Sequence, residues 1–142
     1  MNIEKSELEK LVREILQQQM CNCHCGVRAI KVPTIPVRDC DRLDTGNSSH
    51  KVYTRDLFTL EESPHLGCGI MEMTDTTFDW TLNYDEIDYV IDGSLSVTCN
   101  GVKTTANKGE IILIPKNSKI QFSVDGFARF LYVTYPADWN KI

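Results

Sequence analysis

The chain has 142 residues, of which 42% are hydrophobic and 25% charged, and its net charge is −5. This size and composition are ordinary for one globular domain and exclude a disordered or fibrous protein. An acidic chain lacks the basic surface that nucleic acids and anionic membranes attract, and no apolar run reaches the roughly 18 residues needed to span a bilayer. The charged amino terminus also lacks the apolar core of a signal peptide. We therefore expect a cytoplasmic protein that binds neither nucleic acid nor membrane.

Residues 5–19 have the pattern of an amphipathic helix. Ser6 and Glu9 form a capping box at its start, and apolar residues then recur at helical spacing. These apolar residues are Leu8, Leu11, Val12, Ile15 and Leu16. A helix of this length is marginal alone, because most helical stability comes from burying the apolar face. It therefore docks either on its own domain or on another protein.

A dense group of metal-binding residue types follows the helix, namely Cys21, Cys23, His24 and Cys25. Zinc sites usually space paired ligands by two to four residues and need a second pair farther along the chain. Here the spacing is tighter and the remaining cysteines are isolated, so a thiol-rich linker is favoured over a metal or iron–sulfur site. We expect the thiols to be reduced, and we divide the chain into a helix with its linker, 1–25, and a domain, 26–142.

Prolines at positions 33 and 36 predict irregular or edge structure in the segment before residue 50. From residue 68 onward, short alternating segments are separated by turns at close, even spacing, which predicts an all-β barrel or sandwich. Asn100–Gly101 lies between two such segments and is a strong hairpin signal. The expected strands are 68–73, 80–82, 87–91, 95–99, 102–106, 110–114, 119–124 and 130–135.

The pattern of residues does not decide which face of the strand that starts at residue 86 is buried. Glu86 and Asp88 share one face, roughly 7 Å apart, and Ile87 and Tyr89 lie on the other. A slip of one residue exchanges the two faces. Hydrophobicity alone favours burying the apolar face and leaving both acids in water.

Two spacings resemble the motifs of the cupin superfamily. Glu86 is followed after six residues by Gly93, and Gly109 is followed after five by Pro115. The resemblance implies an all-β fold, a single cupin barrel (double-stranded β-helix, or jelly roll) with an amino-terminal amphipathic helix. It also implies that Glu86 points into the barrel, and Asp88 with it. The apolar residues Ile87, Tyr89 and Ile91 would then face outward and need a cover, so we expect a homodimer.

Three strings of residues are similar to the EutQ family of ethanolamine utilisation proteins. They are Trp80–Asp88, Ile114–Ser118 and Phe130–Trp139, within a resemblance that runs from about residue 56 to the end. This resemblance implies an ATP-dependent acetate kinase that interconverts acetate and acetyl phosphate, associated with a bacterial microcompartment. The chain contains no Gly-x-x-x-x-Gly-Lys-Ser/Thr phosphate-binding loop. The alternative is a non-catalytic metabolite-binding or assembly protein.

The sequence departs from the cupin pattern at the metal ligands. Asp79 and Thr81 stand where cupins carry a His-x-His pair, Ile120 stands at the later histidine position, and only Glu86 remains. A transition metal needs imidazole or thiolate ligands, so we expect no transition metal and assign no metal ligand. The histidines at positions 24, 50 and 65 are expected to be solvated loop residues.

Ionising both acids inside a barrel costs free energy, because desolvation and like-charge repulsion oppose the second charge. A basic side chain or a cation would relieve this cost. The predicted catalytic residues are Glu86, Asp88 and Lys116, and the predicted ligand-binding residues are Thr81, Asn83, Tyr84, Lys119 and Arg129. Such a site could take a small anionic metabolite beside a lysine, or Mg²⁺ with ATP. A microcompartment shell protein is the expected partner of residues 5–19, since this helix resembles an encapsulation peptide.

Overall fold

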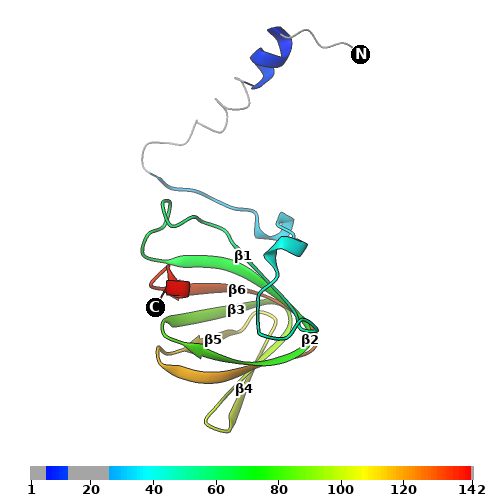
Figure 1. Ribbon diagram of the computed structural model, residues 1–142, viewed down its shortest axis with the longest axis vertical. Helices are drawn as coiled ribbons and strands as arrows, with labels where there is room; N and C mark the ends of the chain where they lie inside the picture. Colours follow the sequence, from blue (N-terminus) through cyan, green and yellow to red (C-terminus); the bar gives the residue numbers. More distant parts are fainter. Residues whose placement is uncertain (1–5, 13–25, 142) are drawn as a thin grey trace. The chain divides into compact units, whose positions relative to one another are not determined.

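The computed structural model describes residues 6–12 and 26–141 and separates into two units, residues 1–32 and 33–142. In the first unit, residues 6–12 are helical, which confirms the start of the predicted helix (Figure 1). Its predicted continuation over 13–19 and the cysteine-rich stretch 21–25 lie outside the described residues. No helix in the described part of the chain is long and apolar enough to cross a membrane.

The second unit is an antiparallel sheet that curves into a barrel (Figure 1). Its strand order is β1-β2-β6-β3-β4, and β5 pairs with β3. The all-β architecture predicted from the sequence is confirmed. The strands are β1 Lys51–Asp56, β2 Gly67–Leu82, β3 Asp85–Cys99, β4 Val102–Asn107, β5 Ile111–Ile114 and β6 Ser118–Tyr135. Three short 3₁₀ turns are also present: η1 Val32–Thr34, η2 Asp39–Asp41 and η3 Trp139–Lys141.

Three long strands replace six of the predicted short ones. β2, β3 and β6 each continue through a point where the sequence predicts a break, because the break is a bend within a paired strand rather than a loop. The β2–β6 register shifts between Thr74 and Thr76, and Asp75 between them has a positive φ of 40°. Such a bend increases the local twist and lets one strand serve both layers of a barrel. Strand β1 was not predicted, because charged residues interrupt its alternation.

Two glycines make turns that other residues could not make as well. The predicted hairpin at Asn100–Gly101 is confirmed, with φ values of 50° and 77° at the two positions. Gly93 lies at the bend of β3 with a φ of 74°, and a Cβ there would lie 1.9 Å from the carbonyl oxygen of Phe127. The close approach of β3 to β6 therefore depends on Gly93, since any side chain would push the two strands apart.

The core of the barrel consists of the inward-facing residues that alternate along the long strands. Phe122 and Phe130 of β6 are essentially buried, as are Leu82 of β2 and Val90 and Leu95 of β3. A polar end of this core lies on β3 and β6, where Glu86, Asp88 and Thr134 are also buried. The barrel interior is therefore apolar along most of its length and acidic at one place.

Candidate functional site

The register of β3 places two acids inside the barrel. Glu86 is 5% exposed and Asp88 is fully buried, whereas Ile87 and Tyr89 are 41% and 44% exposed. Hydrophobicity alone predicted the opposite facing, and the cupin resemblance predicted this one. Pairing with β6 explains the result, because Glu86 lies opposite Thr134 and Asp88 opposite Tyr132, both of which are buried. The inward residues of β6 thus fix the inward face of β3.

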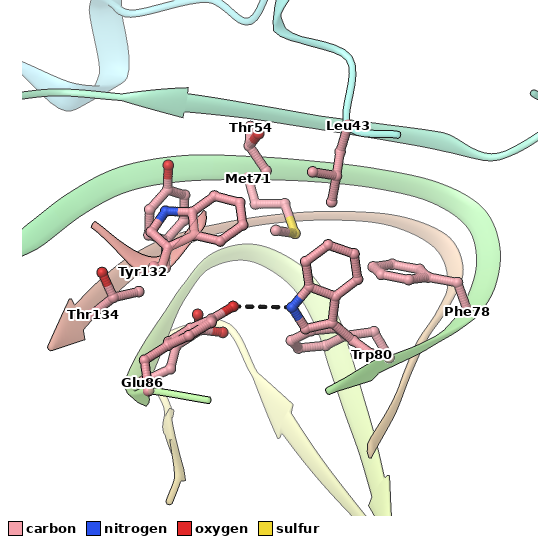
Figure 2. Close-up of a pocket in the computed structure, with 11 residues that line it drawn as sticks. Leu43, Thr54, Met71, Phe78, Trp80, Glu86, Tyr132 and Thr134 are labelled. Atoms are coloured by element: carbon pink, nitrogen blue, oxygen red, sulfur yellow. Dashed lines mark hydrogen bonds between the residues drawn. The ribbon is translucent and has the colours of Figure 1, made fainter. Parts of the chain in front are cut away.

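A pocket opens beside Glu86 at this end of the barrel. Its cavity volume is about 20 Å³, which is room for one or two groups of the size of a water molecule. Figure 2 shows Glu86, Tyr132 and Thr134 on one side of it and Trp80 and Phe78 on the opposite side. The lining residues are Leu43, Thr54, Met71, Phe78, Trp80, Tyr84, Glu86, Phe122, Tyr132, Thr134 and Trp139.

Aromatic side chains form much of the pocket wall. The Trp80 indole N–H donates a hydrogen bond of 2.9 Å to the Tyr84 hydroxyl oxygen, drawn as the dashed line in Figure 2. Trp139, on the carboxy-terminal turn η3, lies with its ring centroid 6.2 Å from that of Trp80 and 5.8 Å from that of Tyr84. These contacts hold the indole of Trp139 against the pocket. Burial raises the pKa of Tyr84, and the neighbouring Glu86 raises it further, so this hydroxyl stays neutral.

The two acids share a proton-dependent contact. Both oxygens of Asp88 are buried without a hydrogen-bond partner among the described residues. Two ionised carboxylates cannot bond each other, but a proton on Asp88 lets it donate to Glu86. Burial raises the pKa of Asp88 well above its ordinary value, and Glu86 raises it further, both by its charge and by this hydrogen bond. Burial likewise raises the pKa of Glu86 to about 7, against the lowering effect of the bond from Asp88. Near neutral pH the pair therefore keeps at least one proton.

The hydroxyl of Thr134 is closed off from the pocket that this residue lines. Thr134 is 1% exposed, and its Oγ1 makes no hydrogen bond within the described part of the protein. That oxygen is inaccessible to a water-sized group and lies against Gly67, on β2. The hydroxyl of Tyr132 differs, because it donates to Asp56 Oδ1 at 2.6 Å. The pocket thus presents one carboxyl group beside an aromatic wall.

Four of the predicted site residues lie on an exposed rim instead of in the pocket. Thr81 and Lys119 are cross-strand partners on β2 and β6, and both are exposed. Asn83 is exposed in the turn between β2 and β3. Lys116 is exposed in the turn between β5 and β6, and its backbone N–H donates to Asp85 Oδ1 at 2.8 Å. We call Thr81, Asn83, Lys116 and Lys119 the rim.

Arg129 also does not reach the acids. Its guanidinium pairs with Glu72, its cross-strand neighbour on β2, and donates to the Ile35 carbonyl oxygen at 2.6 Å. Arg129 lies on the opposite face of β6 from the inward Phe130, so alternation turns it away from the interior. None of the eleven described residues that line the pocket is basic. The prediction that Lys116, Lys119 or Arg129 neutralises the acids is therefore not met by these side chains.

The geometry does not fit Mg²⁺ with ATP at the acid pair. Mg²⁺ keeps several water ligands, and a cavity volume of about 20 Å³ cannot hold a hydrated ion with a nucleotide. Within residues 6–12 and 26–141, no group of three or more His, Cys, Asp or Glu side chains is placed to hold a metal ion. His50 corrects another prediction, because it is half-buried and its Nδ1 lies 2.8 Å from Thr45 Oγ1.

Sequence reasoning missed most of the pocket wall. Tyr132 and Thr134 could have been found from the alternation of residues 130–134, once β6 is paired with β3. Trp139 could not, because it follows the last strand and reaches the pocket through a turn. Tyr84 was the one predicted ligand-binding residue that lines the pocket.

Comparison with known proteins identifies the relatives of this chain. The family model described as ethanolamine utilisation protein EutQ matches residues 3–141. A Clostridioides difficile protein named acetate kinase EutQ is 58% identical over 149 residues, covering 97% of this chain and 95% of its own length. A Salmonella typhimurium protein of the same name is 40% identical over 97 residues, and the match spans 42% of its length and 68% of this chain.

Solved structures show the same relationship. The structure of the Clostridium difficile EutQ protein is similar with a TM-score of 0.81 and 68% identity, covering 82% of this chain and 85% of that one. The cupin domain of Schizosaccharomyces pombe Cnp3 matches with a TM-score of 0.60 and 15% identity, over 76% of this chain and 73% of that one. At that identity the likeness concerns the fold alone, and it confirms the predicted cupin barrel.

The raised pKa of Glu86 predicts a pH-dependent stability. A folded state that holds a proton more tightly than the unfolded chain loses stability as the pH rises from the ordinary pKa of 4.5 to the folded value of about 7. Glu86→Gln removes this loss. The free energy of unfolding of the variant, minus that of the parent, should therefore rise by up to about 3 kcal/mol between pH 4.5 and pH 8. Urea denaturation across this range measures the difference, with Asp92→Asn, an exposed position on the same strand, as the control. A difference that stays constant with pH would contradict the buried pair.

Proposed function

The chain belongs to the EutQ family of ethanolamine utilisation proteins, and on this premise we propose that it interconverts acetate and acetyl phosphate with ATP. The observation that carries the proposal is its 58% identity, along nearly its whole length, to a relative named acetate kinase EutQ. In the forward reaction, a carboxylate oxygen of acetate attacks the γ-phosphorus of ATP. The new oxygen–phosphorus bond forms while the bond to the bridging oxygen of ADP breaks, so no other reactant is needed.

We place the phosphate contacts of this reaction on the rim. Phosphoryl transfer needs positive charge around the transferred group. Lys119 is exposed there opposite Thr81, and Lys116 is exposed in the turn just before β6. The pocket is too small for a nucleotide. Of the three residues predicted to be catalytic, Lys116 therefore contacts phosphate in this proposal, and Glu86 and Asp88 take no step in the transfer. Mg²⁺ would come with the nucleotide.

A second function is a non-catalytic one, in which the barrel binds a metabolite. The observation in its favour is the pocket itself, which is enclosed by aromatic residues, contains a buried carboxyl group and lies apart from the exposed lysines. This alternative needs no nucleotide site. It would also suit a protein whose main role is assembly within a bacterial microcompartment.

The outer face of β3 and β5 supports a homodimer. Ile87 lies opposite Leu113, and Tyr89 opposite Ile111. The two β5 residues are 66% and 63% exposed, so four large apolar side chains form a continuous exposed patch on two neighbouring strands. Patches of this kind mark interaction surfaces on soluble proteins. A second copy of the chain offers the same patch, and two such faces cover each other around a two-fold axis.

The amino-terminal helix supports a separate docking role. Within its own unit, the helix over residues 6–12 carries exposed Leu8, Leu11 and Val12. An amphipathic helix that presents apolar residues suits a groove on another protein. We assign this role to a microcompartment shell protein, which would place the chain in a microcompartment of the cytoplasm.

The kinase proposal predicts a specific loss on the rim. Purified protein given Mg²⁺, ATP and acetate should form acetyl phosphate, which hydroxylamine traps as a coloured hydroxamate complex. The double variant Lys116→Ala with Lys119→Ala should lower kcat/KM for ATP at least about tenfold, because it removes the positive charge. The double variant Lys103→Ala with Lys108→Ala makes the same charge change at other exposed lysines and should keep the activity. No product from a folded wild-type protein would refute the kinase proposal and favour the binding function.

The dimer proposal predicts a change of mass. Light scattering after size-exclusion chromatography should give twice the chain mass for the parent, and the chain mass for Leu113→Glu, because a charge at the centre of the patch opposes its burial. Val102→Glu is the control, since Val102 is 67% exposed on the β3–β4 hairpin. A monomeric parent would contradict the proposal, as would a Leu113→Glu variant that stays dimeric.

The docking proposal predicts that Leu8→Glu with Leu11→Glu abolishes co-purification with microcompartment shells, because two charges oppose burial of the apolar face. The exposed pair Glu7→Gln with Lys10→Gln removes two opposite charges without changing that face and should leave association intact. Unchanged shell association of the Leu8 and Leu11 variant would show that the helix is not the docking element.

A further inference from the structure

We propose that the pocket beside Glu86 binds a small organic ammonium ion, of the size and kind of a two-carbon primary amine or amino alcohol. This inference does not rest on the kinase activity, because it concerns a different place in the molecule. It is carried by two features: an acid with no basic partner among the described residues that line the pocket, and a wall of aromatic rings.

The charge of the pocket favours a cation. Glu86 lines the pocket at 5% exposure, and no lining residue is basic. A buried carboxylate without a counter-charge is costly, and an ammonium group placed against it would supply the missing charge. With Asp88 protonated and donating to Glu86, the pair carries a single negative charge, which one ammonium ion balances. A divalent cation such as Mg²⁺ keeps several water ligands, for which a cavity of about 20 Å³ has no room.

The aromatic wall has the chemistry of an ammonium site. Six of the eleven lining residues are aromatic. The faces of such rings are electron-rich and attract cations within about 6 Å, most strongly at tryptophan. The same faces, and an ionised Glu86, would repel a carboxylate or phosphate. Trp80 and Trp139 contact each other edge to face with centroids 6.2 Å apart, so two indoles form part of the wall.

The size of the cavity limits the ligand. A cavity volume of about 20 Å³ accepts the ammonium group and one attached carbon. The remaining atoms of the ligand must lie toward the mouth of the pocket. A quaternary ammonium is too wide at the nitrogen and lacks N–H groups to donate to Glu86.

Ligand binding should be linked to the ionisation of Glu86. The titratable groups that face it are Asp88 on its own strand, Tyr84 in the turn before β3 and Tyr132 on β6. The walls from β1 and β2 contribute Thr54, Met71, Phe78 and Trp80, which do not titrate. On η3, the charged neighbours of Trp139 are Asp138 and Lys141, which pair with each other at 3.0 Å. Burial raises the pKa of both tyrosines, and that of Asp88 well above its ordinary value, so Glu86 is the group that changes charge near neutrality.

The test is calorimetric titration of the full chain with ethanolamine at pH 8 and pH 6. An alkyl ammonium stays protonated at both pH values, whereas Glu86, with a pKa of about 7, does not stay ionised at pH 6. We expect saturable binding of one molecule per chain at pH 8 and about tenfold weaker binding at pH 6. Ethylene glycol, the neutral analogue, and tetramethylammonium, the wide cation, should not bind.

Variants locate the site. Glu86→Gln should abolish ethanolamine binding. Trp139→Leu should weaken it about fivefold, because it removes one cation-attracting ring from the wall. Trp139 lies on η3, after the last strand, so the barrel of this variant should still fold. Asp92→Asn should bind as the parent does. If Glu86→Gln does not fold, Trp139→Leu decides the question, and unchanged affinity of that variant would contradict the proposal. No saturable ethanolamine binding, equal binding of ethylene glycol, or binding of acetate that strengthens toward pH 6 would each overturn the proposal.

Discussion

The structure depends on the pairing of β3 with β6, which turns an acidic strand face into the barrel. Opposite Glu86 and Asp88 stand Thr134 and Tyr132, and the same ladder continues to Gly93, where only glycine allows the two strands to approach. Once this register is set, the acids are buried and the apolar side chains of the same strand are exposed. The pocket and the proposed dimer surface therefore have one common cause. A slip of one residue would remove both.

Buried acids usually have a basic partner or a metal ion. In the part of the barrel that the structure describes, the side chains around the pair are aromatic, aliphatic or hydroxyl-bearing. The pair meets the cost of burial partly by holding a proton, and Asp88 and Glu86 then form an acid–carboxylate pair. Apolar residues in place of the two buried acids would make the barrel more stable. The same strand carries Ile87 and Tyr89 on its outward face, and a register shifted by one residue would bury these instead of the acids. The burial of the acids therefore supports a ligand of opposite charge.

The sequence was sufficient for the all-β class, the Asn100–Gly101 hairpin and the start of the helix, because each depends on local alternation, turn chemistry or capping. It was insufficient for the continuity of β2, β3 and β6, because bends at Asp75, Gly93 and Gly126 have the same local signature as loops. Hydrophobic alternation wrongly predicted that Glu86 is exposed, because its burial is decided by pairing with β6, which is far away in the chain. The resemblance to cupins predicted correctly that Glu86 points inward. Lys116, Lys119 and Arg129 were predicted as basic partners of the acids. Alternation along β6 turns Lys119 and Arg129 outward, and Lys116 lies in an exposed turn.

The claim on which the account depends is that Glu86 and Asp88 form a buried pair that holds a proton at neutral pH. Carboxyl-carbon NMR of protein labelled at the Asp and Glu side chains measures each titration directly, with Glu86→Gln and Asp88→Asn to assign the signals. We predict one carboxyl signal that titrates near pH 7 and a second that remains protonated beyond it. If all carboxyl signals titrate near their ordinary values of about 4, the pair is solvated and the account fails.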